Sequence, residues 1–281
     1  IPLRLPIGKS GAKLSTMQNR KRQIALMLAN QGYTEVINYP FVNQQLVDAL
    51  GFTGDRAKSF KLANPMSEDF PLLRTHLLPG LLTTLSRNIN RGAKDLALFE
   101  IGSVFRNISP LGKVVLPTTE RKPSQKVIDS IYSSVPNQML FVAGVSCGEK
   151  YLSSWQGEGS RFEWSDAVSK AAEIIESTGN KYEITGTDLA PWHPGRCAEF
   201  KVAGKVVAHA GELHPRVIAT LNLPARTCAF AVILNELPEA KLGAAPKIWN
   251  MPAAVQDIAL VVSKNVSASD VEDSLRMGAG E

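Results

Sequence analysis

Apolar residues recur at helical spacing in several stretches of the chain, and most of these stretches carry signals for a helix start and stop. The first stretch follows Ser15, which forms a capping box with Gln18, and its apolar face includes Ile24 and Leu28. Gly32 is placed to end this helix, because glycine readily adopts the left-handed conformation found there. Further helices are expected after Asn43, across residues 78–89 with Pro79 in the first turn, across residues 127–133 and 166–177, and after Pro215.

Other stretches alternate between apolar and polar residues, which is the pattern of a half-buried strand. Residues 33–42 alternate in this way with Pro40 near the end, and residues 96–105 give another strong strand pattern. Further strands are expected at residues 139–146, 182–185, 198–202, 206–211 and 227–234, with a hairpin turn at Gly204. Short strands joined by hairpins, with helices grouped between them, favour an α+β fold with a mainly antiparallel sheet flanked by helices.

The pattern changes near residue 240, and this divides the chain into three predicted segments. Residues 1–14 are expected to form an extended lead-in, and residues 15–240 a single α+β module. Residues 241–281 begin in a linker-like stretch and continue into a predicted strand at 255–263. A helix is expected to open at Ser267 or Ser269, with Val271 and Leu275 facing inward. One strand and one helix cannot close a hydrophobic core, so we expect a truncated second domain.

Composition narrows the class of protein without naming a function. The chain has 281 residues, with 31 Lys and Arg against 26 Asp and Glu, so the net charge is +5 and permits an RNA partner without requiring one. Apolar runs are far shorter than the roughly 20 residues of a membrane span. Cys147, Cys197 and Cys228 are too widely spaced for a disulfide framework, which favours a reducing, cytoplasmic setting. Because the chain opens at Ile1, we expect it to be a piece of a longer protein.

The sequence gives little support for a metal site or for a familiar catalytic motif. The histidines are His76, His193, His209 and His214. His193 and Cys197 are four residues apart, but Pro194 and Gly195 prevent the helix that would align them as ligands, so no metal site is expected. The GxSxG, HExxH and GxGxxG motifs are absent from the sequence. The basic run at residues 20–22 could face phosphate, but it is interpreted as a solvated helix surface.

Three separate fragments, taken together, resemble the three motifs of class II aminoacyl-tRNA synthetases. The first fragment is QGYTEVINYP at residues 31–40, directly after a basic helix. The second comprises LRT at 73–75 and LFEIGSVFR at 98–106, and the third is GELHPR at 211–216. In that family the first motif is a helix leading to a strand with a proline at a subunit interface. The second and third motifs each bring an arginine to the phosphates of ATP.

The residues that this resemblance would assign to ATP are only partly present. Arg106 matches the arginine of the second motif, but Ile108 stands where the family has a glutamate that places the adenine. Arg216 matches the arginine of the third motif, but Pro215 precedes it. Amino-acid activation builds charge on phosphate oxygens, which fixed guanidinium groups and metal ions must neutralise. We therefore expect the class II outline without catalytic residues, and Arg106, Ile108 and Arg216 are degenerate motif positions.

A larger set of short segments, which includes parts of these fragments, closely resembles the β subunit of bacterial phenylalanyl-tRNA synthetase. The matching phrases are NPMSE at 64–68, LRT at 73–75, LPGLL at 78–82, NINRG at 88–92, LFEIG at 98–102, HPGR at 193–196 and GELHPR at 211–216. This resemblance implies a catalytically silent module that packs against the α subunit of a heterotetramer. It also implies an assembly that charges tRNA(Phe) using ATP and Mg²⁺, neither of which this chain is expected to bind. The segment at residues 252–262 resembles the opening of that family's ferredoxin-like anticodon-binding domain.

The strand with a proline predicts where a partner subunit would dock. Tyr33, Tyr39, Pro40 and Phe41 are the candidates, because aromatic residues can bury a large apolar area against a partner. The alternative is that these side chains belong to the internal core, since alternation does not say which face meets the partner. Two other functions stay open: an active adenylate-forming ligase that uses Arg106 and Arg216, and an autonomous RNA-binding module.

Overall fold

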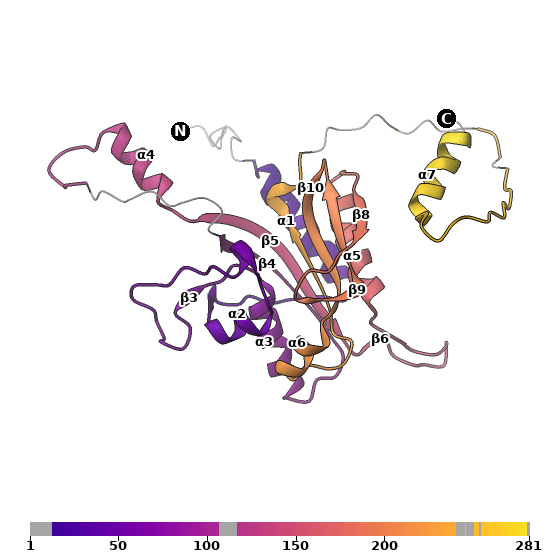
Figure 1. The fold of residues 1–281 in the computed structure, drawn as a ribbon, viewed down its shortest axis with the longest axis horizontal. Coiled ribbons are helices and arrows are strands. Elements are labelled where there is room, and N and C mark those ends of the chain that lie inside the picture. Colours follow the sequence, from indigo (N-terminus) through magenta and orange to yellow (C-terminus); the bar gives the residue numbers. More distant parts are fainter. Residues whose placement is uncertain (1–12, 107–116, 240–244, 246–249, 253, 280–281) are drawn as a thin grey trace, which may run out of the picture. The chain divides into compact units, whose positions relative to one another are not determined.

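The chain divides into two units, Ile1–Lys241 and Leu242–Glu281, which are described separately below. The computed structural model describes residues 13–106, 117–239, 245, 250–252 and 254–279. The helices of the first unit are α1 (Thr16–Asn30), α2 (Gln44–Ala49), α3 (Leu78–Ile89), α4 (Gln125–Ser133), α5 (Trp164–Glu176) and α6 (Pro215–Thr220), with short 3₁₀ turns η1 (Gly54–Arg56) and η2 (Leu234–Glu236). Figure 1 shows their arrangement.

Among the described residues, the strands of the first unit form one large sheet and two small ones. They are β1 (Thr34–Glu35), β2 (Phe41–Val42), β3 (Leu72–Leu73), β4 (Leu96–Arg106), β5 (Asn137–Cys147), β6 (Glu149–Tyr151), β7 (Ser160–Arg161), β8 (Glu183–Gly186), β9 (Trp192–Val202), β10 (Lys205–Leu213) and β11 (Cys228–Ile233). The large sheet has the order β1-β4-β5-β11-β10-β9-β8. Every neighbouring pair in it is antiparallel except β1 and β4. The predicted mainly antiparallel α+β fold is confirmed.

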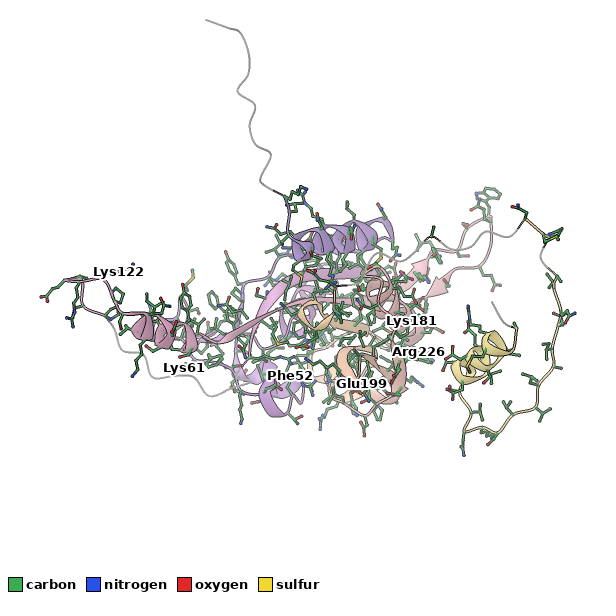
Figure 2. The ribbon with its side chains drawn as sticks, turned by 90° about the horizontal axis from the view of Figure 1, so that it is seen from above. Phe52, Lys61, Lys122, Lys181, Glu199 and Arg226 are labelled. Carbon is green, nitrogen blue, oxygen red and sulfur yellow. The ribbon has the colours of Figure 1, made fainter. Side chains whose placement is uncertain are left out.

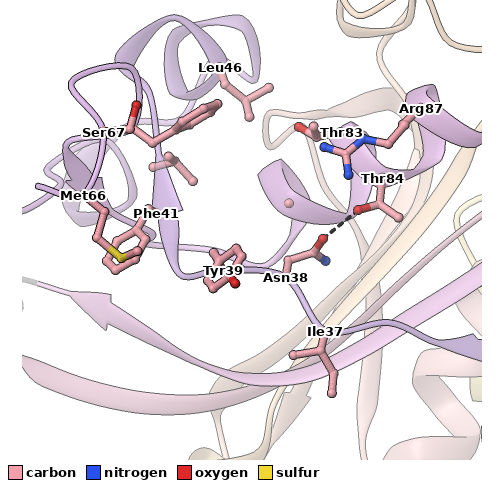
Figure 3. Close-up of a pocket in the computed structure, with 13 residues that line it drawn as sticks. Ile37, Asn38, Tyr39, Phe41, Leu46, Met66, Ser67, Thr83, Thr84 and Arg87 are labelled. Carbon is pink, nitrogen blue, oxygen red and sulfur yellow. Dashed lines mark hydrogen bonds between the residues drawn. The ribbon is translucent and has the colours of Figure 1, made fainter.

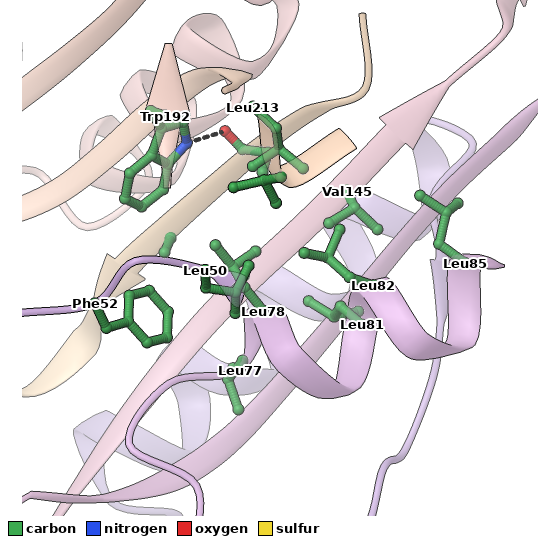
Figure 4. Close-up of a cluster of buried hydrophobic side chains, with 14 of the residues drawn as sticks. Leu50, Phe52, Leu77, Leu78, Leu81, Leu82, Leu85, Val145, Trp192 and Leu213 are labelled. Atoms are coloured by element: carbon green, nitrogen blue, oxygen red, sulfur yellow. Dashed lines mark hydrogen bonds between the residues drawn. The ribbon is translucent and has the colours of Figure 1, made fainter. Parts of the chain in front are cut away.

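Alternation along the long strands gives the sheet two apolar faces. On β5, Phe141, Ala143 and Val145 face one hydrophobic cluster, while Val142 between them faces another. The first cluster lies beneath α3, whose buried leucines fill the space over the sheet, as Figure 4 shows. Two-sided burial explains why the central strands read as nearly continuous apolar runs.

The second cluster is covered by α1 and α5 on the other face. Ile24 and Leu28 of α1 pack there with Phe99 and Phe230 from the sheet. Figure 2 shows Phe52, which belongs to the first cluster, on the side of the sheet opposite α1. Arg20 was expected to be solvated, but it is buried and donates to the carbonyl oxygens of Leu237 and Pro238, at 2.8 Å each. It therefore ties α1 to the end of the module.

Several local signals in the sequence operate as predicted. Ser15 and Gln18 form the capping box of α1, and Gly32 follows the helix with φ at +87°. Asn43 caps α2 by accepting from the backbone N–H of Leu46 at 2.8 Å. Gly204 turns the hairpin between β9 and β10 with φ at +76°. These signals act within a few residues of each other, so they do not depend on the rest of the fold.

The strand predicted for residues 33–42 is not continuous. Its beginning forms β1 in the large sheet, and its end forms β2, which pairs with β3 in a separate sheet. Between them, the side chain of Asn38 donates to Glu100 and accepts from Thr84, and this draws the backbone away from the sheet edge. Pro40 has no N–H to donate to a ladder, which also favours a break.

The second unit contains α7 (Ala268–Ala279) and no strand among its described residues. The strand predicted at 255–263 is therefore wrong for this structure, since a strand needs a neighbour to satisfy its backbone groups. The helix start at Ser267 is confirmed, because its hydroxyl accepts from the N–H of Asp270 at 3.1 Å. Leu275 was expected to face inward but is 42% exposed. Among the described residues, no helix is long and apolar enough to span a bilayer.

The packing of α3 leads to a direct stability test. Leu81 is fully buried against the sheet, so Leu81→Ala is expected to lower the free energy of unfolding by about 2–5 kcal/mol through lost apolar burial and the cavity left behind. Urea denaturation of the 281-residue chain measures this change. Leu26→Ala on α1 is the matched control, because Leu26 is 64% exposed and should cost less than about 0.5 kcal/mol. Equal losses for the two variants would contradict this packing.

Candidate functional site

A buried ion pair organises one edge of the sheet. Arg74 Nη1 and Glu100 Oε1 lie 2.6 Å apart, and both side chains are almost inaccessible to solvent. Arg74 Nε also donates to the carbonyl oxygen of Ser103 at 2.9 Å. Gly102 makes room for the guanidinium, since a Cβ there would overlap Arg74 Nη2. A buried pair of this kind is tolerated only when hydrogen bonds satisfy the remaining polar atoms.

Asn38 connects this ion pair to helix α3. Its Nδ2 donates to Glu100 Oε2 at 2.7 Å, and its Oδ1 accepts from Thr84 Oγ1 at 2.6 Å. Because the Asn38 side chain points inward, the flanking residues Ile37 and Tyr39 point outward and are 93% and 80% exposed. Gly80 allows the close approach of α3, since a Cβ there would lie 3.0 Å from the Cβ of Asn38.

These exposed side chains border a groove of about 390 Å³ (Figure 3). The groove is lined by Ile37, Asn38, Tyr39, Phe41, Val42, Leu46, Met66, Ser67, Phe70, Gly80, Thr83, Thr84 and Arg87. Arg87 is the charged residue in that lining, and most of the others are apolar or small. Met66 is 86% exposed, so large apolar side chains stand in solvent around the groove. Exposed apolar patches of this kind mark protein–protein contact sites.

The four predicted interface residues do not all lie at the same surface. Tyr39 and Phe41 line the groove, with the half-buried Pro40 between them. Tyr33 does not, and its assignment to an interface is corrected: it is 4% exposed and packs edge-on against Phe230, with ring centroids 5.8 Å apart. The break in the strand explains the difference, because Tyr33 precedes β1 while the other residues follow the break.

Sequence reasoning missed the contribution of the loop before β3. Met66 and Phe70 line the groove from that loop. The signal was available in part, since two large apolar residues stand within an otherwise polar turn, NPMSEDF at residues 64–70. Their meeting with Ile37 depends on the pairing of β2 with β3, which the sequence pattern did not predict.

A second cavity, of about 230 Å³, lies on the same face of the sheet as the α3 cluster. Arg106, at the end of β4, lines it but is engaged within the chain. Its Nη1 lies 3.2 Å from Asp55 Oδ2, and its Nε donates to the carbonyl oxygen of Thr75 at 3.1 Å. The guanidinium carbon also sits 4.9 Å from the centre of the Phe141 ring, within the range of a cation–π contact.

The other degenerate motif positions do not join Arg106 in this cavity. Arg216 is exposed at the start of α6, and its guanidinium approaches Gly51; it is not part of the cavity lining. Ile108 lies outside the described residues. The structure thus gives Arg106 a partner in its own chain and does not bring Arg216 to the same cavity.

Two of the histidines face this cavity, and the other two lie together elsewhere. His76 and His209 line it, and burial is the main cause that lowers the pKa of each imidazole below its ordinary value. His193 and His214 are neighbours, with ring centroids 6.3 Å apart. Within the described ranges, no group of three or more His, Cys, Asp or Glu side chains is arranged to hold a metal ion. Cys147, Cys197 and Cys228 are free and buried.

A comparison with protein families identifies the family to which this chain belongs. Residues 1–234 match the family model described as the phenylalanyl tRNA synthetase beta chain CLM domain. The chain belongs to the phenylalanyl-tRNA synthetase β-chain family. A phenylalanine–tRNA ligase β subunit from Streptomyces avermitilis is 42% identical over 289 residues, covering 100% of this chain and 35% of the relative. One from Thermobifida fusca is 41% identical, with the same coverage.

This β-chain family member spans about a third of the length of those relatives. Among solved structures, a pyrrolysyl-tRNA synthetase from Desulfitobacterium hafniense resembles it with a TM-score of 0.54 and 16% identity, over 79% of this chain and 67% of that one. A second structure of the enzyme from the same organism gives 0.54 and 15%. At this identity the likeness shows the fold, and the predicted class II synthetase-like architecture is confirmed. The predicted membership of the β-chain family is confirmed as well.

The buried imidazole of His76 makes the stability of this β-chain module depend on pH. Its pKa is lower in the folded chain than the ordinary value of 6.5, so the unfolded chain binds more protons below that pH. The contribution is complete above about pH 6.5 and is lost as the pH falls, by at most about 1.4 kcal/mol per pH unit. His76→Asn keeps an acceptor for the Leu78 N–H and is expected to reduce the fall in urea-derived stability between pH 7 and about pH 5, while the part due to the buried His209 remains.

His193→Asn is the matched control for this pH experiment, because His193 is only half-buried and lies outside the cavity. It should leave the slope of stability against pH as in the unaltered chain. A His76→Asn variant with that same slope would contradict the role assigned to the buried imidazole.

Proposed function

We propose that this chain is the non-catalytic, class II-like module of a phenylalanine–tRNA ligase β subunit, and that it packs against the α subunit through the groove beside α3. The observation that carries the proposal is the presentation of Ile37 and Tyr39 as exposed side chains on a segment fixed by Asn38. Membership of the β-chain family supports the role of a subunit in this ligase.

The groove has the chemistry of a protein-binding surface. Its rim carries Tyr39, Met66 and Phe70, and tyrosine, methionine and phenylalanine are enriched at the centre of interfaces. Ile37 and Tyr39 would lose most of their exposed area on contact, and each buried Å² of apolar surface contributes about 25 cal/mol. The hydrogen bonds of Asn38 hold this segment before the partner arrives, so little ordering is needed on binding.

The cavity that contains Arg106 supports the absence of catalysis in this chain. Attack of an amino-acid carboxylate on ATP needs several donors that converge on the charge developing on the phosphate oxygens. Arg106 is bound by Asp55 and Thr75, and Arg216 does not line the cavity. An active ligase that used both arginines would need Arg106 and Arg216 to converge on one site, and they do not line the same cavity. No observation favours an autonomous RNA-binding module.

The remaining roles follow from the proposed subunit assignment. The α subunit would hold the active site, and the assembly would use ATP and Mg²⁺ to attach phenylalanine to tRNA(Phe). The second unit would belong to an anticodon-binding domain of ferredoxin-like fold. The assembly would work in the cytoplasm, a reducing compartment in which free cysteines persist as thiols.

Charges placed on the groove rim should weaken the contact with the α subunit. Ile37→Asp with Tyr39→Asp, introduced into the complete β subunit, is expected to raise the Kd for α at least tenfold, because carboxylates would be desolvated in an apolar interface. Both positions are exposed, so folding should be spared. Co-purification and tRNA charging are the measurements.

Tyr151→Asp is the matched control for the interface test. Tyr151 is 65% exposed and lies on β6, away from the groove lining. Its replacement should leave the affinity for α unchanged. Retention of full α affinity by the groove variant, or an equal loss in the control, would refute the proposed docking surface.

Amino-acid activation should require the α subunit. The 281-residue chain alone, with phenylalanine and Mg-ATP, is expected to give no ATP–pyrophosphate exchange above a protein-free blank. The complex of α with the complete β subunit should exchange readily under the same conditions. Exchange by the chain alone at the rate of the complex would show that the module is an active ligase.

A further inference from the structure

Arg56 is a buried cation whose charge is only partly met. The residue is 8% exposed, and it forms no salt bridge within the described part of the chain. Its Nη1 donates to the carbonyl oxygen of Ala190 at 2.8 Å, and its guanidinium carbon lies 5.2 Å from the centre of the Phe52 ring. A carbonyl and a ring face do not neutralise a charge, so burying this guanidinium is costly. Arg56 also lines the 230 Å³ cavity that contains Arg106.

The two guanidinium groups share one carboxylate. Asp55 is bound at 3.2 Å to Arg106, whose side chain is 11% exposed, while the Asp55 side chain itself is 39% exposed. Burial and the nearby Arg106 both lower the pKa of Arg56, and Asp55 opposes them to a lesser extent. The lining residues themselves therefore carry two cations and one anion, and a second carboxylate, Glu199, stands behind the wall at 3.2 Å from His209 Nε2.

His76 adds a third donor at the same cavity. Its Nδ1 accepts the backbone N–H of Leu78 at 3.1 Å, and burial holds the pKa of the imidazole well below 6.5. The neutral ring then carries its proton on Nε2. His76 is 3% exposed, and no hydrogen bond joins Nε2 to another described residue. Arg56 and His76 therefore offer N–H groups around one space, together with Arg106 Nη2, since only the Nε and Nη1 of Arg106 are bound to described residues.

Apart from His209, whose Nε2 lies 3.2 Å from Glu199 Oε2, the rest of the lining is apolar. Phe141, Leu189, Trp192, Val206 and Ile233 contribute to the walls, and the indole N–H of Trp192 is already bound to the carbonyl oxygen of Ala229. Water occupies about 30 Å³ per molecule in the liquid, so a cavity of 230 Å³ has room for a small organic molecule. Cationic donors on one side and apolar walls on another suit a molecule with an anionic head and a compact apolar body.

We propose that this cavity binds a small organic anion, a carboxylate or a phosphate monoester with a compact apolar group, through Arg56, Arg106 and His76. The anionic head pairs with the two guanidinium groups, and the apolar group lies against Phe141 and Trp192. This site goes beyond the proposed function, because it requires neither the α subunit nor tRNA. Arg56 and His76 belong to none of the degenerate motif positions.

Calorimetric titration of the 281-residue chain with benzoate and with phenyl phosphate tests the site. Saturable binding of at least one of them is expected, and the comparison of the two identifies the preferred head group. Arg56→Met should weaken binding at least tenfold. Arg91→Met, at an exposed position on the loop after α3, is the matched control and should leave it unchanged.

Asp55→Asn keeps the test decisive if Arg56→Met does not fold. This variant removes the carboxylate that competes for Arg106 at a partly exposed position, so it should strengthen anion binding severalfold. Far-UV circular dichroism establishes that each variant is folded. Absence of saturable binding, equal binding of benzyl alcohol, no response to Asp55→Asn, or a preference for Mg-ATP over phenyl phosphate would each overturn the proposal.

Discussion

The buried ion pair between Arg74 and Glu100 is the constraint on which the arrangement of this module depends. A charged pair this far from water must have its remaining polar atoms satisfied, and the chain meets that need with Asn38 and the Ser103 carbonyl oxygen. Meeting it brings together three segments that are distant in sequence: the break after β1, the approach to α3, and β4. The outward direction of the groove side chains follows from this inward network.

Much of the fold was predictable because its signals are local. The capping box at Ser15 and the alternation along β4 depend on neighbours a few residues away, and both were correctly identified. The break in the strand at residues 36–40 was not predictable in that way, because Asn38 meets Glu100 across 62 residues of sequence. The strand expected at 255–263 failed for a related reason, since no local pattern can supply the neighbouring strand that it needs.

The candidate sites show the same division between local and distant information. Tyr39 and Phe41 could be predicted from an aromatic strand carrying a proline, whereas Tyr33 satisfied the same pattern and lies in the core. Alternation places a side chain on one side of a strand but does not say what covers that side. Arg56 gave no signal at all, because a lone arginine near a turn is ordinary until the fold buries it beside Arg106.

Arg74 also has a consequence for the solubility of the module. Strand β1 is two residues long, so it pairs with only the beginning of the outer edge of β4. Further along that edge, the N–H of Phe105 donates to the carbonyl oxygen of Arg74 at 2.9 Å, while the Arg74 side chain occupies the Ser103 carbonyl. Unpaired strand edges recruit other chains and promote aggregation. The arginine that orders the groove therefore also shields a sheet margin that would otherwise be open to intermolecular pairing.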